Sequence, residues 1–175
     1  MDYKRIIAAL LIFLPFTSSF ASQTRYVIEG VPHIRQGDYL CTVASCEMVL
    51  SYHKYDISQA EIAKRDIRNI EKKVEMDLEK IEMYLKERGI RVHYRAGDLE
   101  RIKDYVQRDM PVILLMWTDF DKKDKRARVA IGFDDKKKTI ILIDPADAKE
   151  HEIGYGPFLK LWDVEEKKIL LIYPQ

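Results

Sequence analysis

The sequence predicts an α+β fold made of one domain, and three observations lead to this prediction. Segments with helical periodicity come first, and apolar strand-like segments follow them. A chain of 175 residues is long enough for one ordinary core but not for two independent ones. With 47% apolar and 34% charged residues, the composition is typical of a globular domain. We expect the N-terminal helical half to pack on a mostly antiparallel sheet.

The first 21 residues have the layout of a secretory signal peptide. Lys4 and Arg5 precede the apolar run "IIAALLIFLPF", and small or polar residues follow it. This run is shorter than the roughly 20 residues that cross a bilayer, so an uncleaved anchor is the weaker alternative. We therefore expect an exported chain, periplasmic or secreted, with no stable membrane insertion after cleavage. Its single domain is predicted to span residues 22–175.

Charge and metal-ligand spacing narrow the possible functions. Removal of residues 1–21 takes Asp2, Lys4 and Arg5 from the 29 acidic and 30 basic side chains, which leaves 28 of each. A chain without net charge lacks the basic surface that nucleic acids require, so we exclude that class. The four histidines are scattered, and neither Cys-x-x-Cys nor His-x-x-x-His spacing occurs. We expect no metal and no cofactor.

Three segments predict the helical half, after the extended opening segment "TRYVIEGVPHIRQ". A helix is expected from about Cys41 to His53, with apolar residues on its core side. Ser58 and Glu61 have the spacing of a capping box, which predicts the start of a short second helix. In "VEMDLEKIEMYLKERG", apolar residues recur with a period near 3.6, which predicts an amphipathic helix that ends at Gly89.

The strand half begins with the β-like segment "IRVHYRA". Asp98 then caps the predicted helix "LERIKDYVQRD", and "PVILLMWT" is a continuous apolar strand that we expect near the centre of the sheet. The segments "RARVAIGF" and "KTIILIDP" flank "DDKK" and predict a hairpin. A helical turn at "PFLKLW" and a last strand "KILLIYP" close the chain.

Cys41 stands at the predicted start of the first helix, where unpaired backbone N–H groups and the helix dipole favour a thiolate. Five residues of continuous helix would separate its Cα from that of Cys46 by about 8 Å, beyond the reach of a disulfide. Two buried, unreactive thiols are the commoner alternative. A cysteine hydrolase also needs a base and an oxyanion donor, and the side-chain amide of Gln36 is a candidate for the donor.

Several segments occur in an order that resembles one peptidase family. Val31 and Pro32 come first, then Gln36, Cys41, "ASCEMVLSY", "RDMPVILLMW", "RVAIGFDD…IILIDP" and "F…LW". This order resembles the peptidases that cut double-glycine leaders from bacteriocin precursors, within the papain-like cysteine peptidases. The resemblance implies a papain-like fold over the whole mature chain. It also implies that Cys41 is the nucleophile, that Gln36 is the oxyanion donor and that Asp144 orients the base.

An arginine occupies the position of the expected catalytic histidine. The papain-like pattern has a histidine six residues before the hairpin glycine, and here Arg126 stands six residues before Gly132. Arginine keeps its proton and cannot act as a general base. We expect the Arg126 guanidinium to contact the Asp144 carboxylate, as an ion pair in place of a His–Asp pair. His33, in the opening segment, and His151, in a predicted polar loop, are left open as relocated bases.

Three functions are compatible with these residues. We favour an exported, catalytically impaired papain-like domain that binds a peptide or protein segment in an extended conformation, because Arg126 replaces the base. The alternative is an active cysteine peptidase that uses Cys41 with a relocated base, so the sequence leaves enzymatic activity open. The third is a structural exported protein in which Cys41 and Cys46 are packed or oxidised together.

Overall fold

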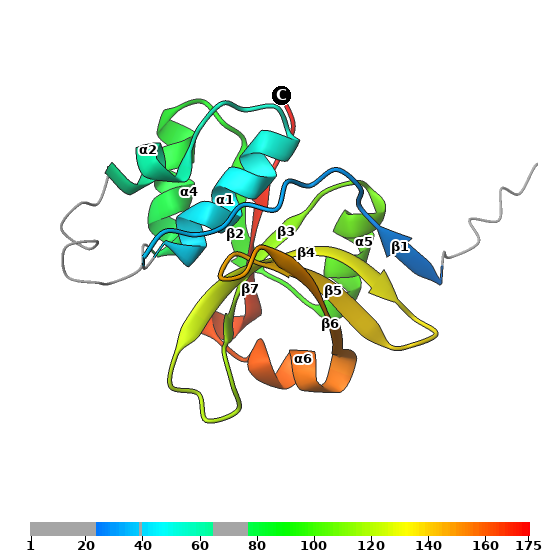
Figure 1. Cartoon of the computed structure of the whole chain (residues 1–175). Helices are drawn as coiled ribbons and strands as arrows, with labels where there is room; N and C mark the ends of the chain where they lie inside the picture. Colours follow the sequence, from blue (N-terminus) through cyan, green and yellow to red (C-terminus); the bar gives the residue numbers. More distant parts are fainter. Residues whose placement is uncertain (1–23, 39, 65–76) are drawn as a thin grey trace, which may run out of the picture.

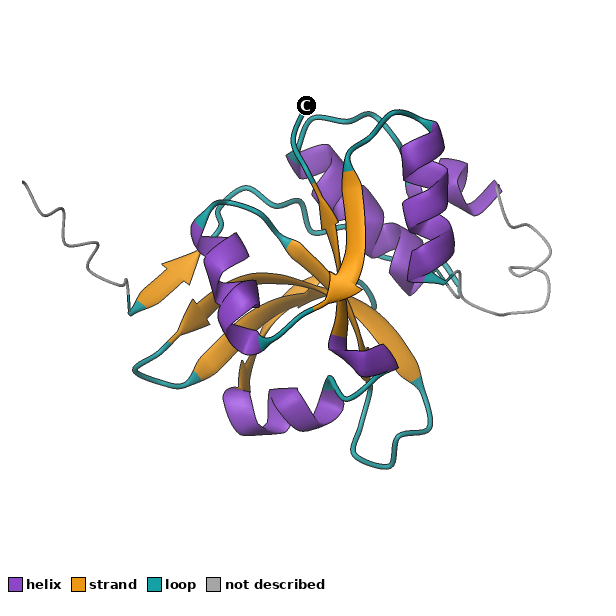
Figure 2. Cartoon of the chain, turned by 180° about the vertical axis from the view of Figure 1, so that it is seen from behind, coloured by secondary structure: helices purple, strands orange, loops and turns teal. Residues whose placement is uncertain are grey.

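A sheet of seven antiparallel strands forms the centre of the computed structural model, which describes residues 24–38, 40–64 and 77–175 (Figure 1). The strands of this described part are β1 (Arg25–Val27), β2 (Val92–Ala96), β3 (Val112–Trp117), β4 (Lys125–Asp134), β5 (Thr139–Asp144), β6 (Lys149–Gly154) and β7 (Lys168–Ile172). Their order is β2-β7-β3-β4-β5-β6, and β1 pairs with the last residues of β4. The strands fan out in Figure 2, as the natural twist of a sheet requires.

The helices of the N-terminal half gather beside one end of the sheet (Figure 1). The helices described are α1 (Cys41–Tyr52), α2 (Gln59–Ala63), α4 (Leu78–Glu87), α5 (Leu99–Gln107), α6 (Tyr155–Leu161) and the 3-10 helix η2 (Glu165–Lys167). α1 packs on β3 and β4, α5 on β1, β3 and β4, and α6 on β5 and β6. The predicted α+β class, with a helical half packed on an antiparallel sheet, is confirmed.

The predicted signal peptide, residues 1–21, lies outside the described residues. None of the described helices is both long enough and apolar enough to span a bilayer. One cluster of buried apolar side chains extends from the described helices into the strands.

Helix α1 is buried almost all round, which explains its weak sequence periodicity. Every side chain from 41 to 50 is buried except Glu47. A helix of this kind lies inside the core instead of presenting one polar face to water. The residues that we expected in the core are at most 1% exposed: Val43, Cys46, Val49 and Leu50. α1 therefore holds its first residue rigidly against the sheet.

The predicted capping residues occupy their expected places. The Ser58 side chain accepts a hydrogen bond from the backbone N–H of Glu61 at 3.2 Å, at the start of α2. Asp98 accepts from the N–H of Arg101 at 2.8 Å, at the start of α5. Gly89 follows α4 with a φ of +74°, the left-handed conformation in which glycine commonly ends helices. These local predictions are confirmed.

The predicted polar loop around His151 is wrong, because this segment is strand β6. β6 pairs with β5 from the Thr139–Gly154 pair to the Asp144–Lys149 pair, and it forms one edge of the sheet. Its first four side chains are all exposed. A strand that buries neither face shows no alternation of apolar and polar residues, so the sequence pattern did not reveal it.

Gly132, the hairpin glycine, allows β1 to approach β4 closely. It pairs with Val27 and lies at a register shift between β4 and β5. A Cβ atom at this position would lie 2.8 Å from the carbonyl oxygen of Tyr26. A larger residue would therefore push β1 away from the sheet.

Candidate active site

Cys41 is the first residue of α1 and is fully buried, with 0% of its surface exposed. Its Sγ accepts a hydrogen bond from the backbone N–H of Ala127 in β4 at 3.2 Å. The hydroxyl of Thr42 lies 3.8 Å from the same sulfur. The thiol thus stands at the helix start, as predicted, and is joined to β4 directly.

The residue before Ala127 in β4 is Arg126, which we predicted to stand at the position of a catalytic histidine. The Nη1 atom of Arg126 is 3.6 Å from Oδ2 of Asp144, across the β4–β5 hairpin. The predicted contact between this guanidinium and this carboxylate is confirmed. The Arg126 side chain is 35% exposed, so part of this ion pair faces solvent.

Arg128 is the closer partner of Asp144, and sequence reasoning missed it. Its Nε donates a hydrogen bond to Oδ2 of Asp144 at 2.7 Å, and the two side chains are only 11% and 7% exposed. Val129 pairs with Ile143, so Arg128 comes opposite Asp144 in the antiparallel register. The "RAR" triplet could have indicated this contact, because residues two apart point to the same face of a strand, so Arg128 shares the face of Arg126.

Asp144 is satisfied on both of its carboxylate oxygens. Oδ2 faces the two guanidiniums, and Oδ1 accepts from the backbone N–H of Ala146 at 2.9 Å. Nη1 of Arg128 is buried without a hydrogen-bond partner in the described part of the chain. The Asp144 carboxylate thus neutralises arginine side chains.

Gln36 reaches the same region from the opening segment. Its backbone N–H donates to the carbonyl oxygen of Pro145 at 2.9 Å, so it lies next to the end of β5. Its side-chain Oε1 is buried and has no hydrogen-bond partner among the described residues. The structure therefore brings Gln36 to the segment that carries Asp144.

Gln59, from α2, holds the segment that carries Gln36, and no sequence pattern had indicated this role. Its Oε1 accepts from the backbone N–H of Gly37, and its Nε2 donates to the carbonyl oxygen of Arg35, both at 3.1 Å. One amide side chain thus bonds to the residues on both sides of Gln36. A short polar clamp of this type fixes a segment that has no strand partner.

His33, His93 and His151 each contact another side chain. His33 Nε2 lies 3.5 Å from Glu150, and His151 Nε2 lies 3.0 Å from Asp147. His93 packs edge-on against a tyrosine ring. These contacts give no support to a relocated base at His33 or His151.

Two other expectations concern the second cysteine and metals. Cys41 and Cys46 are both buried, and no disulfide joins them in the structure. Burial raises the pKa of Cys46 far above its ordinary value. The described residues contain no group of three or more histidine, cysteine or acidic side chains that would hold a metal ion.

A buried cysteine at a helix start, beside an antiparallel hairpin that ends in a buried aspartate, defines a cysteine-peptidase-like arrangement. The model of the Peptidase_C39 like family matches residues 28–168, and the chain belongs to this family. The crystal structure of a candidate C39-like peptidase from Bacillus anthracis is similar over 86% of this chain and 98% of that chain, with a TM-score of 0.69. The two sequences are 15% identical, so this likeness shows the fold alone. The comparison with curated proteins gave no match.

Proposed function

We propose that this chain is an exported C39-like domain that does not hydrolyse peptides and instead binds a peptide or protein segment in an extended conformation. One observation supports the proposal: the Asp144 carboxylate is held by Arg126 and Arg128, and we expect Arg126 to stand at the position of the general base. Both guanidiniums keep their protons at any workable pH, so neither accepts the proton of a thiol. Export and an extracytoplasmic location rest on the signal-peptide pattern of residues 1–21.

The burial of Cys41 supports the loss of hydrolysis. A thiolate attacks a peptide only if its sulfur comes within about 3–3.5 Å of the carbonyl carbon. Cys41 has no exposed surface, and its Sγ is already bonded to the N–H of Ala127. Even with a reactive thiol, the amine leaving group must be protonated by a side chain that can both accept and donate a proton, and arginine does not do so.

The edge of the sheet supports binding of an extended segment. β6 is an outer strand, and in the described part of the chain no strand pairs with its free side. Its first residue, Lys149, pairs with Asp144 at the candidate site. An extended peptide that adds to β6 by backbone hydrogen bonds would therefore start next to the site.

The test compares the purified chain with three variants: Cys41→Ala, Arg126→His and Arg126→Gln. A mixed peptide library is incubated with each protein, and new peptide termini are counted by mass spectrometry. We expect no cleavage above the Cys41→Ala control by the native chain. Arg126→His restores a base beside the thiol, so any gain in cleavage is expected there and not in the matched Arg126→Gln. Binding is measured with the same library by affinity selection on the immobilised native chain.

Cleavage by the native chain that disappears in Cys41→Ala would overturn the proposal. It would support the alternative, an active cysteine peptidase with a relocated base. That alternative has one observation in its favour, because Gln36, Cys41 and Asp144 are all present and lie on adjoining segments. Failure of the immobilised chain to enrich any peptide would overturn the binding role.

A further inference from the structure

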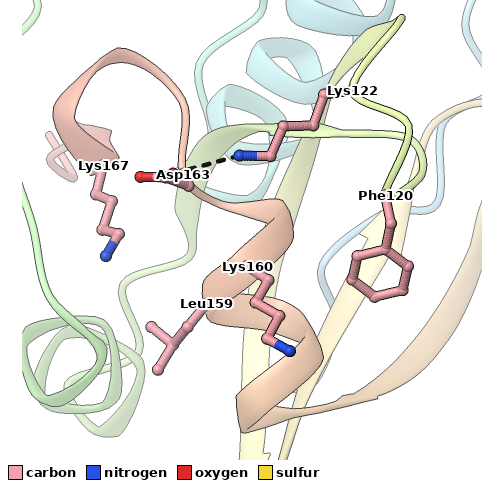
Figure 3. Close-up of a pocket in the computed structure, with 6 residues that line it drawn as sticks. All are labelled: Phe120, Lys122, Leu159, Lys160, Asp163 and Lys167. Carbon is pink, nitrogen blue, oxygen red and sulfur yellow. Dashed lines mark hydrogen bonds and ion pairs between the residues drawn. The ribbon is translucent and has the colours of Figure 1, made fainter.

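A hollow of about 500 Å³ lies between the β3–β4 loop, helix α6 and the segment that leads into β7 (Figure 3). Six residues line it: Phe120, Lys122, Leu159, Lys160, Asp163 and Lys167. These elements lie at the lower end of the molecule in Figure 1, whereas α1, α2 and α4 lie at the upper left. The hollow is built from other residues than the candidate active site.

The lining carries an excess of positive charge. Lys122 is paired with Asp163, with Nζ and Oδ2 3.3 Å apart. Lys160 and Lys167 form no ion pair within the described ranges, although acidic residues are present in the adjoining loop. One of those acidic residues, Asp121, is paired with a different lysine. The hollow therefore holds two lysine charges that its own acidic residue does not neutralise.

An exposed aromatic ring accompanies these charges. Phe120 is 62% exposed, and it is one of two large apolar side chains with this degree of exposure in the described part of the chain. In Figure 3, Leu159 lies between Lys167 and Lys160, and Phe120 lies beyond Lys160. An apolar side chain of a partner would thus find Leu159 between two ammonium groups, with Phe120 beside one of them. Exposed aromatic residues of this kind often anchor a bound partner.

The backbone at the rim of the hollow is held in a strained conformation. Glu165, Glu166 and Lys167 have φ values of +48°, +58° and +56°, and Lys122 has +55°. Residues other than glycine in this region cost about 1–2 kcal/mol each. Lys167 is fixed from both sides, since its N–H donates to Val164 at 2.8 Å and its carbonyl oxygen accepts from Gly97 at 3.0 Å.

We infer that this hollow is a docking site for an acidic segment of a partner protein, in which carboxylates flank an apolar side chain. The two unneutralised lysines face the carboxylates, and Phe120 with Leu159 contacts the apolar side chain. A flat bilayer surface contacts protruding side chains more readily than side chains that line a concavity, as these do. The chemistry therefore favours a peptide segment over a membrane.

The test uses a fluorescein-labelled peptide, Glu-Glu-Leu-Glu-Glu-Phe-Glu-Glu, and measures its anisotropy with the purified chain at low salt. We expect saturable binding that weakens as salt rises, because screening shortens the range of exposed charges. The double variant Lys160→Glu with Lys167→Glu is expected to bind about tenfold more weakly, since two attractions become two repulsions. Phe120→Ser is expected to weaken binding without changing its salt dependence.

The matched control is the double variant Lys136→Glu with Lys138→Glu. Both residues are exposed in the turn between β4 and β5, and the change in net charge is the same. We expect this control to keep most of the affinity. Equal losses in the two double variants would show a general charge effect and overturn the proposal, as would the absence of saturable binding.

Two further arms distinguish docking in the hollow from binding to a lipid surface and from binding at the candidate active site. Vesicles that contain phosphatidylglycerol are offered to the same variants, and binding to vesicles but not to the peptide would overturn the proposal in favour of a lipid surface. Arg126→Gln is expected to bind the peptide with native affinity. A large loss in that variant would place the peptide at the candidate active site and refute docking in the hollow. This result does not depend on whether the chain cleaves peptides.

Discussion

Replacement of Arg128 by methionine is expected to destabilise the fold much more than the same replacement of Arg126. Arg128 and Asp144 are 11% and 7% exposed and are joined by a 2.7 Å hydrogen bond, so this is a buried ion pair. Removal of one partner of a buried pair costs about 3–5 kcal/mol, because the other charge stays buried. Asp144 keeps its hydrogen bond from Ala146 and its contact with Arg126, so we expect the lower end, about 3 kcal/mol.

The matched control is the same replacement at Arg126, which lies on the same face of β4 as Arg128 and contacts the same Asp144 carboxylate. Its side chain is 35% exposed and lies 3.6 Å from Asp144, so this pair resembles a surface ion pair. Such pairs contribute at most about 1 kcal/mol. We expect Arg126→Met to change the free energy of unfolding by less than that amount.

Urea unfolding followed by tryptophan fluorescence measures both variants under one set of conditions. For a chain of this size, a loss of about 3 kcal/mol corresponds to a decrease of about 6–12 °C in Tm, which calorimetry checks independently. If Arg126→Met costs as much as Arg128→Met, then Asp144 depends mainly on Arg126, and the assignment of Arg128 as the principal partner is refuted.

Three other predictions concern single residues. Cys41 is fully buried, so we expect iodoacetamide to label it far more slowly in the folded chain than in urea. Intact mass spectrometry measures the labelling, with Cys41→Ala as the control. Rapid labelling of the folded chain would contradict the burial of this thiol. Burial lowers the pKa of His53, so the unfolded chain takes up this proton more readily. Stability is expected to be constant above the unfolded pKa of about 6.5 and to fall as the pH decreases below it. His53→Gln should flatten this dependence in urea titrations at pH 8 and 5.5, and an unchanged slope would exclude His53 as its source. Gln59→Ala removes the two hydrogen bonds on either side of Gln36. We expect this change to lower the free energy of unfolding by about 1–2 kcal/mol and to speed hydrogen exchange at the Gly37 amide. Unaltered exchange would show that other contacts hold this segment.

Local signals in the sequence predicted much of the secondary structure. A capping side chain bonds to an N–H two or three residues away, so Ser58 and Asp98 marked helix starts whatever the rest of the fold does. Gly89 marked the end of α4 for a similar reason. β6 escaped prediction because its partner is β5 and its first four side chains are exposed. An edge strand of this kind is defined by backbone pairing, which leaves little trace in residue types.

In the candidate site, too, the sequence indicated some features, and others depended on contacts between distant segments. The order of the segments indicated Gln36, Cys41, Arg126 and Asp144, and the structure places Cys41 against β4 and Gln36 beside Pro145. The predicted contact between Arg126 and Asp144 is present. The Gln59 clamp was not predictable, because it joins segments that are 22 to 24 residues apart through one flexible side chain.

The sequence by itself determined the fold class and predicted the contact between Arg126 and Asp144, since both follow from which residues are present and in what order. Only the tertiary structure decided that Arg128 is the nearer partner of Asp144 and that the Cys41 thiol has no exposed surface. Strand alternation places Arg126 and Arg128 on one face, but the β4–β5 register and the depth of burial select between them. Register and burial are sums over many distant contacts, so no short stretch of sequence contains them.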